Sequence, residues 1–285
     1  MYNYNTLENT SINILYQTFL SSFSDYQVKF NISLSDFESM LIRRGYTPKF
    51  SIGAFKNDEL VGFIYNGLRI WNGKKTIYDT GTGVIKNYRK QGITTLMFNY
   101  LIKDLVKTDV ECYLLEVLKS NISAFNLYKN QGFEIVRELE CFKMKKSKYK
   151  ISSKVNTESK YALTDEEWSQ IIEFWDIKPS WQNSIDSIKS AINNFIFLLV
   201  KDKSNIIGYG IIDKNTGDIP QFAVHHKYRN KGIGTSIVTN LIKNTQSDTI
   251  SILNIDKSYT PIIKMLLSLG FENFVGQYEM LLNLK

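Results

Sequence analysis

The sequence is poor in residues that cross-link a chain or bind metal ions. It has only 2 cysteines and 2 histidines among 285 residues. Cys112 and Cys141 each fall in a strand-like segment, so we expect both to be small buried hydrophobes rather than a disulfide framework. His225 and His226 are adjacent, and neighbouring side chains on a strand point to opposite faces, which is poor geometry for one metal ion. We therefore predict no metal site.

Long apolar runs are also missing. The longest, FIFLLV at residues 195–200, suits a buried strand and is far shorter than the roughly 20 residues that span a bilayer. The opening residues MYNYNTLENT lack a basic region followed by an apolar core, so no signal peptide is expected. With 4 prolines and 16 glycines, long disordered tracts are not expected either. These absences favour a cytoplasmic protein that does not bind membranes.

The formal net charge of +7 is compatible with nucleic acid or with an anionic ligand. The densest basic stretch, KMKKSKYKISSK, spans residues 143–154. We interpret it as a strand end that runs into a linker, because only Tyr149 is available beside it for stacking on bases. Binding to nucleic acid is the less favoured alternative, and it predicts salt-sensitive retention on DNA or RNA.

An internal repeat is the strongest feature of the sequence. NYRKQGITT at residues 87–95 returns 140 positions later as KYRNKGIGT at 227–235. Matched landmarks in one order indicate two copies of a domain, which we place at residues 1–146 and 160–285 on either side of a polar linker. The other matched pairs are LVGFIYNG and IIGYGIID at residues 60 and 206, LIK at 101 and 241, and NQGFE and SLGFE at 130 and 268.

Each copy mixes helical and strand patterns in the same order, which predicts an α/β (α+β) sheet domain. Residues 93–106 are typical of an amphipathic helix, with apolar residues three and four apart. The helices expected in the first copy are 7–24, 34–44, 93–106 and 122–130, and the strands are 50–55, 60–70, 76–85, 112–118 and 133–144. In the second copy we expect helices near 165–175 and 185–193, strands at 195–201, 206–213 and 250–255, and again a helix that follows Gly232.

The repeated stretch has the composition of an anion site. A helix N-terminus carries unpaired N–H groups and a partial positive charge. Glycine at this point lets a phosphate approach the backbone, and neighbouring basic side chains add charge. Residues 89–94 and 229–234 therefore predict two diphosphate sites that need no metal. Neither matches the GxxxxGK[ST] loop of nucleotide hydrolases or the GxGxxG fingerprint.

Around this stretch the sequence resembles the GNAT superfamily of acyl-CoA-dependent N-acetyltransferases. The resemblance covers most of residues 1–145 and is weaker in the second copy. In the first copy it rests on Val84, Tyr88, Arg89, Gly92, Ile93, Leu115, Glu116, Val117, Asn121, Ala124, Leu127, Tyr128, Gly132 and Phe133. In the second copy it rests on Val224, Tyr228, Arg229, Gly232, Gly234, Gly270 and Phe271.

The resemblance implies a fold and a set of roles. Each domain would have a mixed, mostly antiparallel central sheet flanked by helices, with acetyl-CoA as cosubstrate. Val84 would direct a backbone N–H at the thioester carbonyl, Asn121 would touch the pantetheine or the next helix, and Tyr128 would protonate the departing thiolate. Pyrophosphate would be held by the amides of Arg89, Lys90, Gln91, Gly92, Ile93 and Thr94. The equivalent cofactor positions in the second copy are Val224, Arg229, Lys231, Gly232 and Gly234.

The acid and the base can also be argued from chemistry. A phenol with a pKa near 10 stays protonated at neutral pH and can protonate a leaving thiolate, although Tyr128 could instead only pack beside Leu127. Glu116 is our candidate base, and Asp79 on the neighbouring predicted strand is the alternative. The amine could also arrive uncharged, in which case neither carboxylate is needed.

The second copy departs from the family pattern more than the first. Thr94 replaces a commoner glycine or alanine in the first copy, whereas Leu266 occupies the position of Tyr128 in the second. Leucine cannot protonate a thiolate, and we do not expect His225 or Tyr259 to substitute. We therefore expect a catalytic first copy and a degenerate second copy, which shapes the acceptor site or retains CoA. The tryptophans of the second copy, Trp168, Trp175 and Trp181, are interpreted as packing residues.

These features predict transfer of an acetyl group from acetyl-CoA to a primary amine by direct attack. The acceptor could be a small molecule or a peptide N-terminus, and the chain could be a monomer or a homodimer. The alternative function is a CoA-binding sensor or scaffold without turnover.

Overall fold

The computed structural model describes residues 1–25, 32–149 and 153–285. Contacts divide the chain into two compact units, which we describe separately. Unit 1 consists of Met1–Val136 and Tyr278–Lys285, and unit 2 consists of Arg137–Gln277.

Unit 1 is built on a sheet in the order β1-β2-β3-β4-β5, with β12 next to β5. The first four strands pair antiparallel, whereas β4 and β5 are parallel. Tight turns with positive φ at Asn57, Asp58, Asn72 and Gly73 connect β2 to β3 and β3 to β4. The strands are β1 (Asn3–Thr6), β2 (Ile52–Lys56), β3 (Glu59–Trp71), β4 (Lys74–Val84), β5 (Cys112–Leu118) and β12 (Glu272–Asn283).

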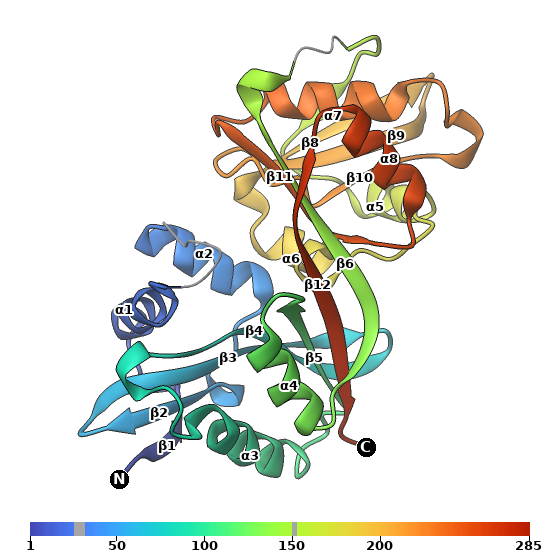
Figure 1. Cartoon of the computed structure of the whole chain (residues 1–285). Helices are drawn as coiled ribbons and strands as arrows, with labels where there is room; N and C mark the ends of the chain where they lie inside the picture. The colour runs from blue at the N-terminus through green and yellow to red at the C-terminus, as the bar shows by residue number, and fades with distance from the viewer. Residues whose placement is uncertain (26–31, 150–152) are drawn as a thin grey trace. The chain divides into compact units, whose positions relative to one another are not determined.

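Helices cover both faces of this sheet (Figure 1). On one face, α1 and α2 pack against the stacked rings of Phe63 and Tyr65, whose centroids lie 4.0 Å apart. On the other face, α3 and α4 pack against a second apolar cluster that contains Ile64, Ile77 and Tyr113. The four helices are α1 (Ile12–Phe23), α2 (Leu34–Arg44), α3 (Ile93–Leu105) and α4 (Ile122–Asn130).

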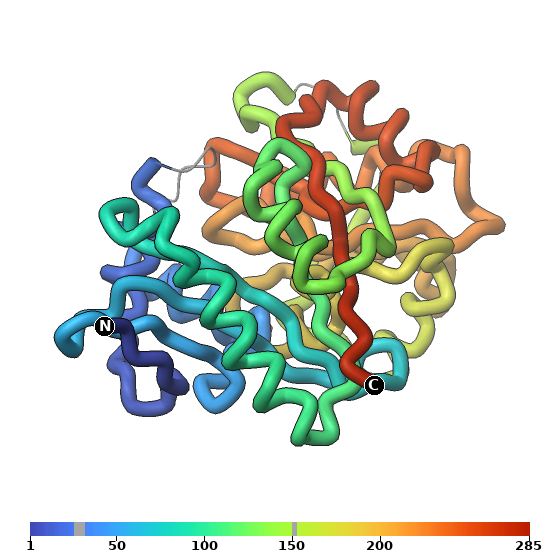
Figure 2. The backbone as a smooth tube through the Cα atoms, turned by 60° about the horizontal axis from the view of Figure 1, so that its bottom comes forward, coloured from blue at the N-terminus to red at the C-terminus, as the bar shows by residue number. Residues whose placement is uncertain are grey.

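The last strand of the chain belongs to both units. Residues 272–277 of β12 lie in unit 2 and residues 278–283 in unit 1, and Figure 2 shows the red C-terminal segment ending in unit 1. Met280 is fully buried in the core of unit 1. β6 (Glu134–Lys145) also divides, with residues 137–145 in unit 2. The compact units thus differ from the ranges 1–146 and 160–285, which remain a prediction for the two sequence copies.

Unit 2 repeats the layers of unit 1. Its four-stranded sheet has the order β10-β9-β8-β7, and β11 pairs antiparallel with β6. One apolar cluster contains α7 and α8 residues, and another contains α5 and α6 residues. The elements are β7 (Glu158–Lys160), α5 (Asp165–Ile172), α6 (Ile185–Ser190), β8 (Phe195–Asp202), β9 (Asn205–Asp213), β10 (Gln221–Val224), α7 (Ile233–Lys243), β11 (Thr249–Asp256) and α8 (Thr260–Ser268).

Most predicted elements are confirmed, and α2, β5 and α4 match the expected residues. The helix predicted over 7–24 begins too early, because Leu7 is buried beneath the sheet edge and the chain before it forms β1. The helix predicted over 165–175 ends at Ile172, and the one over 185–193 ends at Ser190. Short strands β1 and β7 were not predicted, since neither has an alternating apolar pattern.

Candidate functional site

Several predicted site residues of unit 1 lie where β4 and β5 separate. The two strands pair only from Thr76 to Tyr78, opposite residues 112–114, and both continue beyond. We call this opening the splay. The N–H of Ile85 donates to the carbonyl of Val61. Gly62 and Val84 are therefore a non-hydrogen-bonded pair of the antiparallel β3–β4 ladder. The backbone N–H of Val84 therefore points away from β3, toward the splay.

The start of α3 lies at the open end of the splay. Gly92 is the N-cap residue with a φ of 73°, and Lys90 has a φ of 62°. A Cβ on Gly92 would have no heavy atom within 4 Å, so the space above this backbone is open. The first amide with an acceptor is Leu96, which donates to Gly92. Within the described chain, the amides of residues 90–95 have no hydrogen-bond acceptor, and this row of donors fits a diphosphate.

The side chain of Arg89 does not face this row. Its guanidinium donates to the carbonyls of Val84 and Ser22, at 3.0 and 2.7 Å, and forms an ion pair with Asp25 at 2.8 Å. The Arg89 amide already donates to Lys86. Arg89 therefore fastens the end of β4 to the end of α1, and the predicted reinforcement of the anion cradle by its charge is not what the geometry provides.

Tyr128 and Asp79 meet at the closed end of the splay. Tyr128 on α4 is 7% exposed, and its hydroxyl donates to Asp79 Oδ2 at 3.4 Å. Asp79 is the first residue of β4 beyond the last pair with β5. Its carboxylate also accepts from the Gly81 amide at 2.8 Å and the Thr82 hydroxyl at 2.7 Å. Burial raises the pKa of Asp79 to about 6, although these hydrogen bonds oppose the shift.

Glu116 lies on the other face of the sheet. Its neighbours Leu115 and Val117 belong to the cluster under α3 and α4, so Glu116 points toward the α1 and α2 side. There it hydrogen-bonds Tyr78, whose pKa is raised chiefly by burial and also by this carboxylate. The structure thus brings Tyr128 together with Asp79, the alternative base, and not with Glu116.

The remaining predicted residues of unit 1 have structural contacts. Asn121 is the N-cap residue of α4, and its side chain accepts from the Ala124 amide at 3.2 Å, so it touches the next helix. Gln91 accepts a hydrogen bond from Tyr2. Ile93 is buried in the core, and Thr94 is half-buried on the first turn of α3.

Unit 2 repeats the helix start in detail. Gly232 caps α7 with a φ of 77°, and the first amide with an acceptor is Ser236. Arg229 donates to the carbonyls of Val224 and Phe174 and pairs with Asp176 at 2.7 Å, as Arg89 does with Val84, Ser22 and Asp25. Lys231 lies over the Tyr228 ring, at 5.3 Å from its centroid. A Cβ on Gly234 would meet only side-chain atoms of Met265 and Val224.

The positions of Asp79 and Tyr128 are occupied by apolar residues in unit 2. At the repeat offsets, Ile219 replaces Asp79 and Leu266 replaces Tyr128. Both side chains are fully buried in one apolar cluster. Unit 2 therefore has no acid or base at the positions where unit 1 has its pair.

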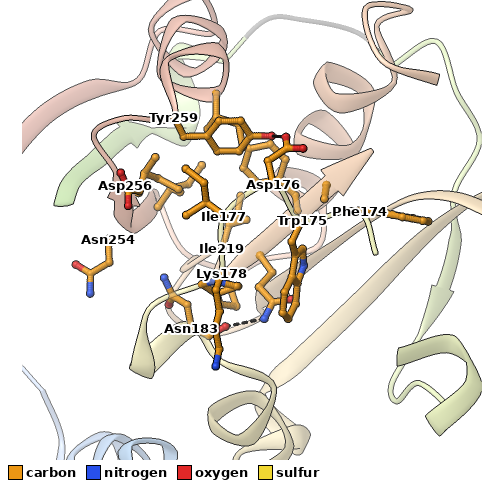
Figure 3. A pocket seen from close by; sticks show the side chains of 18 of the residues that line it. Phe174, Trp175, Asp176, Ile177, Lys178, Asn183, Ile219, Asn254, Asp256 and Tyr259 are labelled. Carbon is orange, nitrogen blue, oxygen red and sulfur yellow. Dashed lines mark hydrogen bonds between the residues drawn. The ribbon is translucent and has the colours of Figure 1, made fainter. Parts of the chain in front are cut away.

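A tyrosine also spans the opening between β10 and β11. Tyr259 precedes α8, at the position of Asn121, and its hydroxyl donates to Asp176. Asp176 is held through Arg229 to Val224 at the end of β10. Figure 3 shows this Tyr259–Asp176 bridge at one side of a cavity, with Ile219 and Trp175 also in its lining. Burial, and then the hydrogen bond to Asp176, raise the pKa of Tyr259 to about 12.

Other predictions have mixed outcomes. Both cysteines are free and buried, as expected. The two histidines do not point apart, because His225 follows the end of β10 and the rings lie 4.2 Å from each other. Trp168 and Trp181 are buried packing residues, whereas Trp175 lines the cavity and donates to Tyr209.

In the described ranges, no three His, Cys, Asp or Glu side chains are grouped so that they could hold a metal ion. The same residues include no helix of the length and apolarity needed to cross a membrane. Two lysines of the basic stretch contact residues that are distant in the sequence: Lys146 donates to the carbonyl of Thr245, and Lys148 pairs with Glu272. Residues 150–152 of this stretch lie outside the described part.

Comparison with protein-family models gives one family. The model described as the acetyltransferase (GNAT) family matches residues 12–133 and again residues 160–271. The two matches together cover more than half of the chain and coincide with the internal repeat. Members of this family bind acetyl-CoA or CoA. No curated protein matches the sequence significantly.

Solved structures share the fold at low sequence identity. A tandem GNAT protein from the clavulanic acid biosynthesis pathway is 10% identical with a TM-score of 0.74, covering 100% of this chain and 99% of its own. A GCN5-related N-acetyltransferase from Sphaerobacter thermophilus is 12% identical with a TM-score of 0.73, covering 100% and 96%. One from Anabaena variabilis is 12% identical with a TM-score of 0.62, covering 100% and 73%. These values establish a shared tandem fold.

Proposed function

Since this chain belongs to the acetyltransferase (GNAT) family, we propose that it is an N-acetyltransferase that moves an acetyl group from acetyl-CoA to a primary amine. The observation that carries the proposal is the alignment of three features in unit 1. These are the unpaired amides of residues 90–95, the Val84 N–H directed into the splay, and Tyr128 at its closed end.

We assign the chemistry to unit 1. The amide row would bind the CoA diphosphate, and the Val84 N–H would polarise the thioester carbonyl and stabilise the oxyanion that forms there. The amine attacks directly, and Tyr128 gives its proton to the leaving sulfur. Glu116, on the α1 and α2 side, is the proposed base for an amine that arrives from that side.

We further propose that each chain binds one acetyl-CoA. The Tyr259–Asp176 bridge joins the end of β10 to the start of α8. It crosses the opening between β10 and β11, which corresponds to the open splay of unit 1. Behind it, Ile219 lines the cavity of Figure 3, and Leu266 is buried in the same apolar cluster as Ile219. The repeated helix start of unit 2 therefore lacks a channel for the pantetheine arm.

The test is a thiol-release assay with acetyl-CoA and a panel of small amines and peptide N-termini. We expect Tyr128→Phe to lower kcat by about 10²-fold or more with little change in the KM for acetyl-CoA. Tyr161→Phe is the matched control, because Tyr161 is 75% exposed on unit 2. If acetyl-CoA binds but no amine releases CoA, the protein is a CoA-binding sensor instead.

A further inference from the structure

The buried carboxylate of Asp79 accepts a hydrogen bond from Tyr128, whose proton the proposed reaction of unit 1 requires. Asp79 Oδ2 accepts hydrogen bonds from both Thr82 and Tyr128, at 2.7 and 3.4 Å. Asp79 is 9% exposed, and edge contacts of Phe98 and Phe133 surround the Tyr128 ring. Water is therefore largely excluded from this pair.

A tyrosine hydroxyl has only one proton to donate. While it donates that proton to Asp79, it cannot donate it to a sulfur in the splay. If Tyr128 lost the proton while Asp79 was ionised, a phenolate and a carboxylate would face each other in a buried site. Two like charges at such a distance strongly disfavour this state.

We infer that Asp79 is a positioning residue that controls the Tyr128 proton, holding it when ionised and releasing it toward the splay when neutral. The inference rests on the proposed function of unit 1. A neutral carboxyl donates its own proton to the Tyr128 oxygen, and the Tyr128 hydroxyl then turns to the sulfur. In the reaction the C–N bond forms and the C–S bond breaks. The Tyr128 proton goes to sulfur, and Glu116 takes the proton lost by nitrogen. Exchange with solvent then restores both side chains, so no other reagent is needed.

The charge of Asp79 depends on few neighbours. Arg44 of α2 and Tyr78 of β4 act on this region electrostatically, and Glu116 acts through Tyr78. Tyr113 of β5 is also near, but its hydroxyl donates to Asn66 at 2.7 Å. Because burial is the largest influence and raises the pKa to about 6, the neutral form is accessible near neutral pH.

The decisive variant is Asp79→Asn. An asparagine amide can accept from Gly81 with its oxygen and donate to Tyr128 with its nitrogen, which imitates the neutral carboxyl. We expect kcat of Asp79→Asn to equal the wild-type value within a few-fold at pH 5.5. The ratio of the two kcat values should then rise about tenfold per pH unit above pH 6.5. Titration of the amine cancels in this ratio.

Two further variants keep the inference testable if Asp79→Asn does not fold. Thr82→Val removes a hydrogen bond to the ionised form, so it should shift the fall in kcat to higher pH. The double variant Asp79→Asn with Tyr128→Phe should be as slow as Tyr128→Phe alone, because Asp79 acts through Tyr128. A constant ratio across pH, or an unshifted profile in Thr82→Val, would overturn the inference.

Infrared spectroscopy separates this inference from the proposed function. At pH 5.5 the wild type should show the carbonyl band of a protonated acid that Asp79→Asn lacks, and Tyr128→Phe should retain that band to higher pH. If no amine releases CoA, the proposed function fails while this titration still decides the Asp79–Tyr128 pair. If the band is absent or unchanged in Tyr128→Phe, the pair is not coupled, whatever the enzyme does.

Discussion

The stability of unit 1 should depend on pH through the buried carboxyl of Asp79. Asp79 has an ordinary pKa of 3.8 in the unfolded chain, and burial raises it to about 6 in the folded protein. The folded state therefore holds this proton more tightly than the unfolded state does. The difference of about 2 pKa units, at about 1.36 kcal/mol each, amounts to about 3 kcal/mol in the free energy of unfolding.

The sign follows from the direction of the shift. The stabilisation is fully present below pH 3.8, is lost as the pH rises to about 6, and stays constant above it. Asp79→Asn has no proton to lose. The wild type should therefore lose about 3 kcal/mol relative to Asp79→Asn between pH 4 and pH 6.5.

Urea unfolding at half-unit pH intervals measures this difference, because other titrating groups cancel between the two proteins. Asp109→Asn is the control of opposite sign. Asp109 is exposed and its hydrogen bond to Lys75 lowers its pKa, so its contribution is lost as the pH falls. Parallel curves for wild type and Asp79→Asn would show that the Asp79 pKa is not raised, and the reasoning from burial would be refuted.

Three further predictions concern other parts of the chain. Met280→Ala should destabilise unit 1 by about 2–5 kcal/mol, because this side chain near the C-terminus is fully buried in the unit 1 core. Faster amide hydrogen exchange in unit 1 would detect the loss, and faster exchange in unit 2 alone would contradict it. Gly92→Ala should weaken CoA binding about tenfold in calorimetry, because its Cβ would enter the open space above the amide row, and a backbone that relaxes from the φ of 73°, which costs a non-glycine residue roughly 1–2 kcal/mol, would misplace these amides. Gly73→Ala, in a turn with a φ of 77°, should leave affinity unchanged. Calorimetry of the wild type should give one CoA per chain, and a stoichiometry of two would show that the Tyr259–Asp176 bridge does not close unit 2.

The sequence predicted the repeat and most helices and strands because those signals are local. Glycine at a helix start, apolar residues at three-and-four spacing and alternating strand patterns depend on neighbours along the chain. The ranges of α2, β5 and α4 were predicted correctly for this reason. The start of α1 was misplaced because Leu7 has an apolar side chain that suits either a helix or a buried loop.

The site was only partly predictable. Tyr128 was predicted from the resemblance of the surrounding residues to the family pattern, and the anion site at residues 89–94 was predicted from the repeated glycine at a helix start. The side-chain direction of Arg89 was not, because its partners Ser22 and Asp25 are more than sixty residues away. The choice between Glu116 and Asp79 as partner of Tyr128 depended on which face of the sheet each side chain occupies.

By itself the sequence determined the family, the tandem repeat and the loss of the tyrosine in the second copy, since each is recorded in residue identities at fixed spacings. Only the tertiary structure decided that β12 completes the core of unit 1, that Asp79 holds the Tyr128 hydroxyl and that Tyr259 bridges the opening in unit 2. Those contacts join residues 49 to 83 positions apart, or segments at opposite ends of the chain. Burial, strand register and desolvation, which set their energies, arise only when the chain is packed.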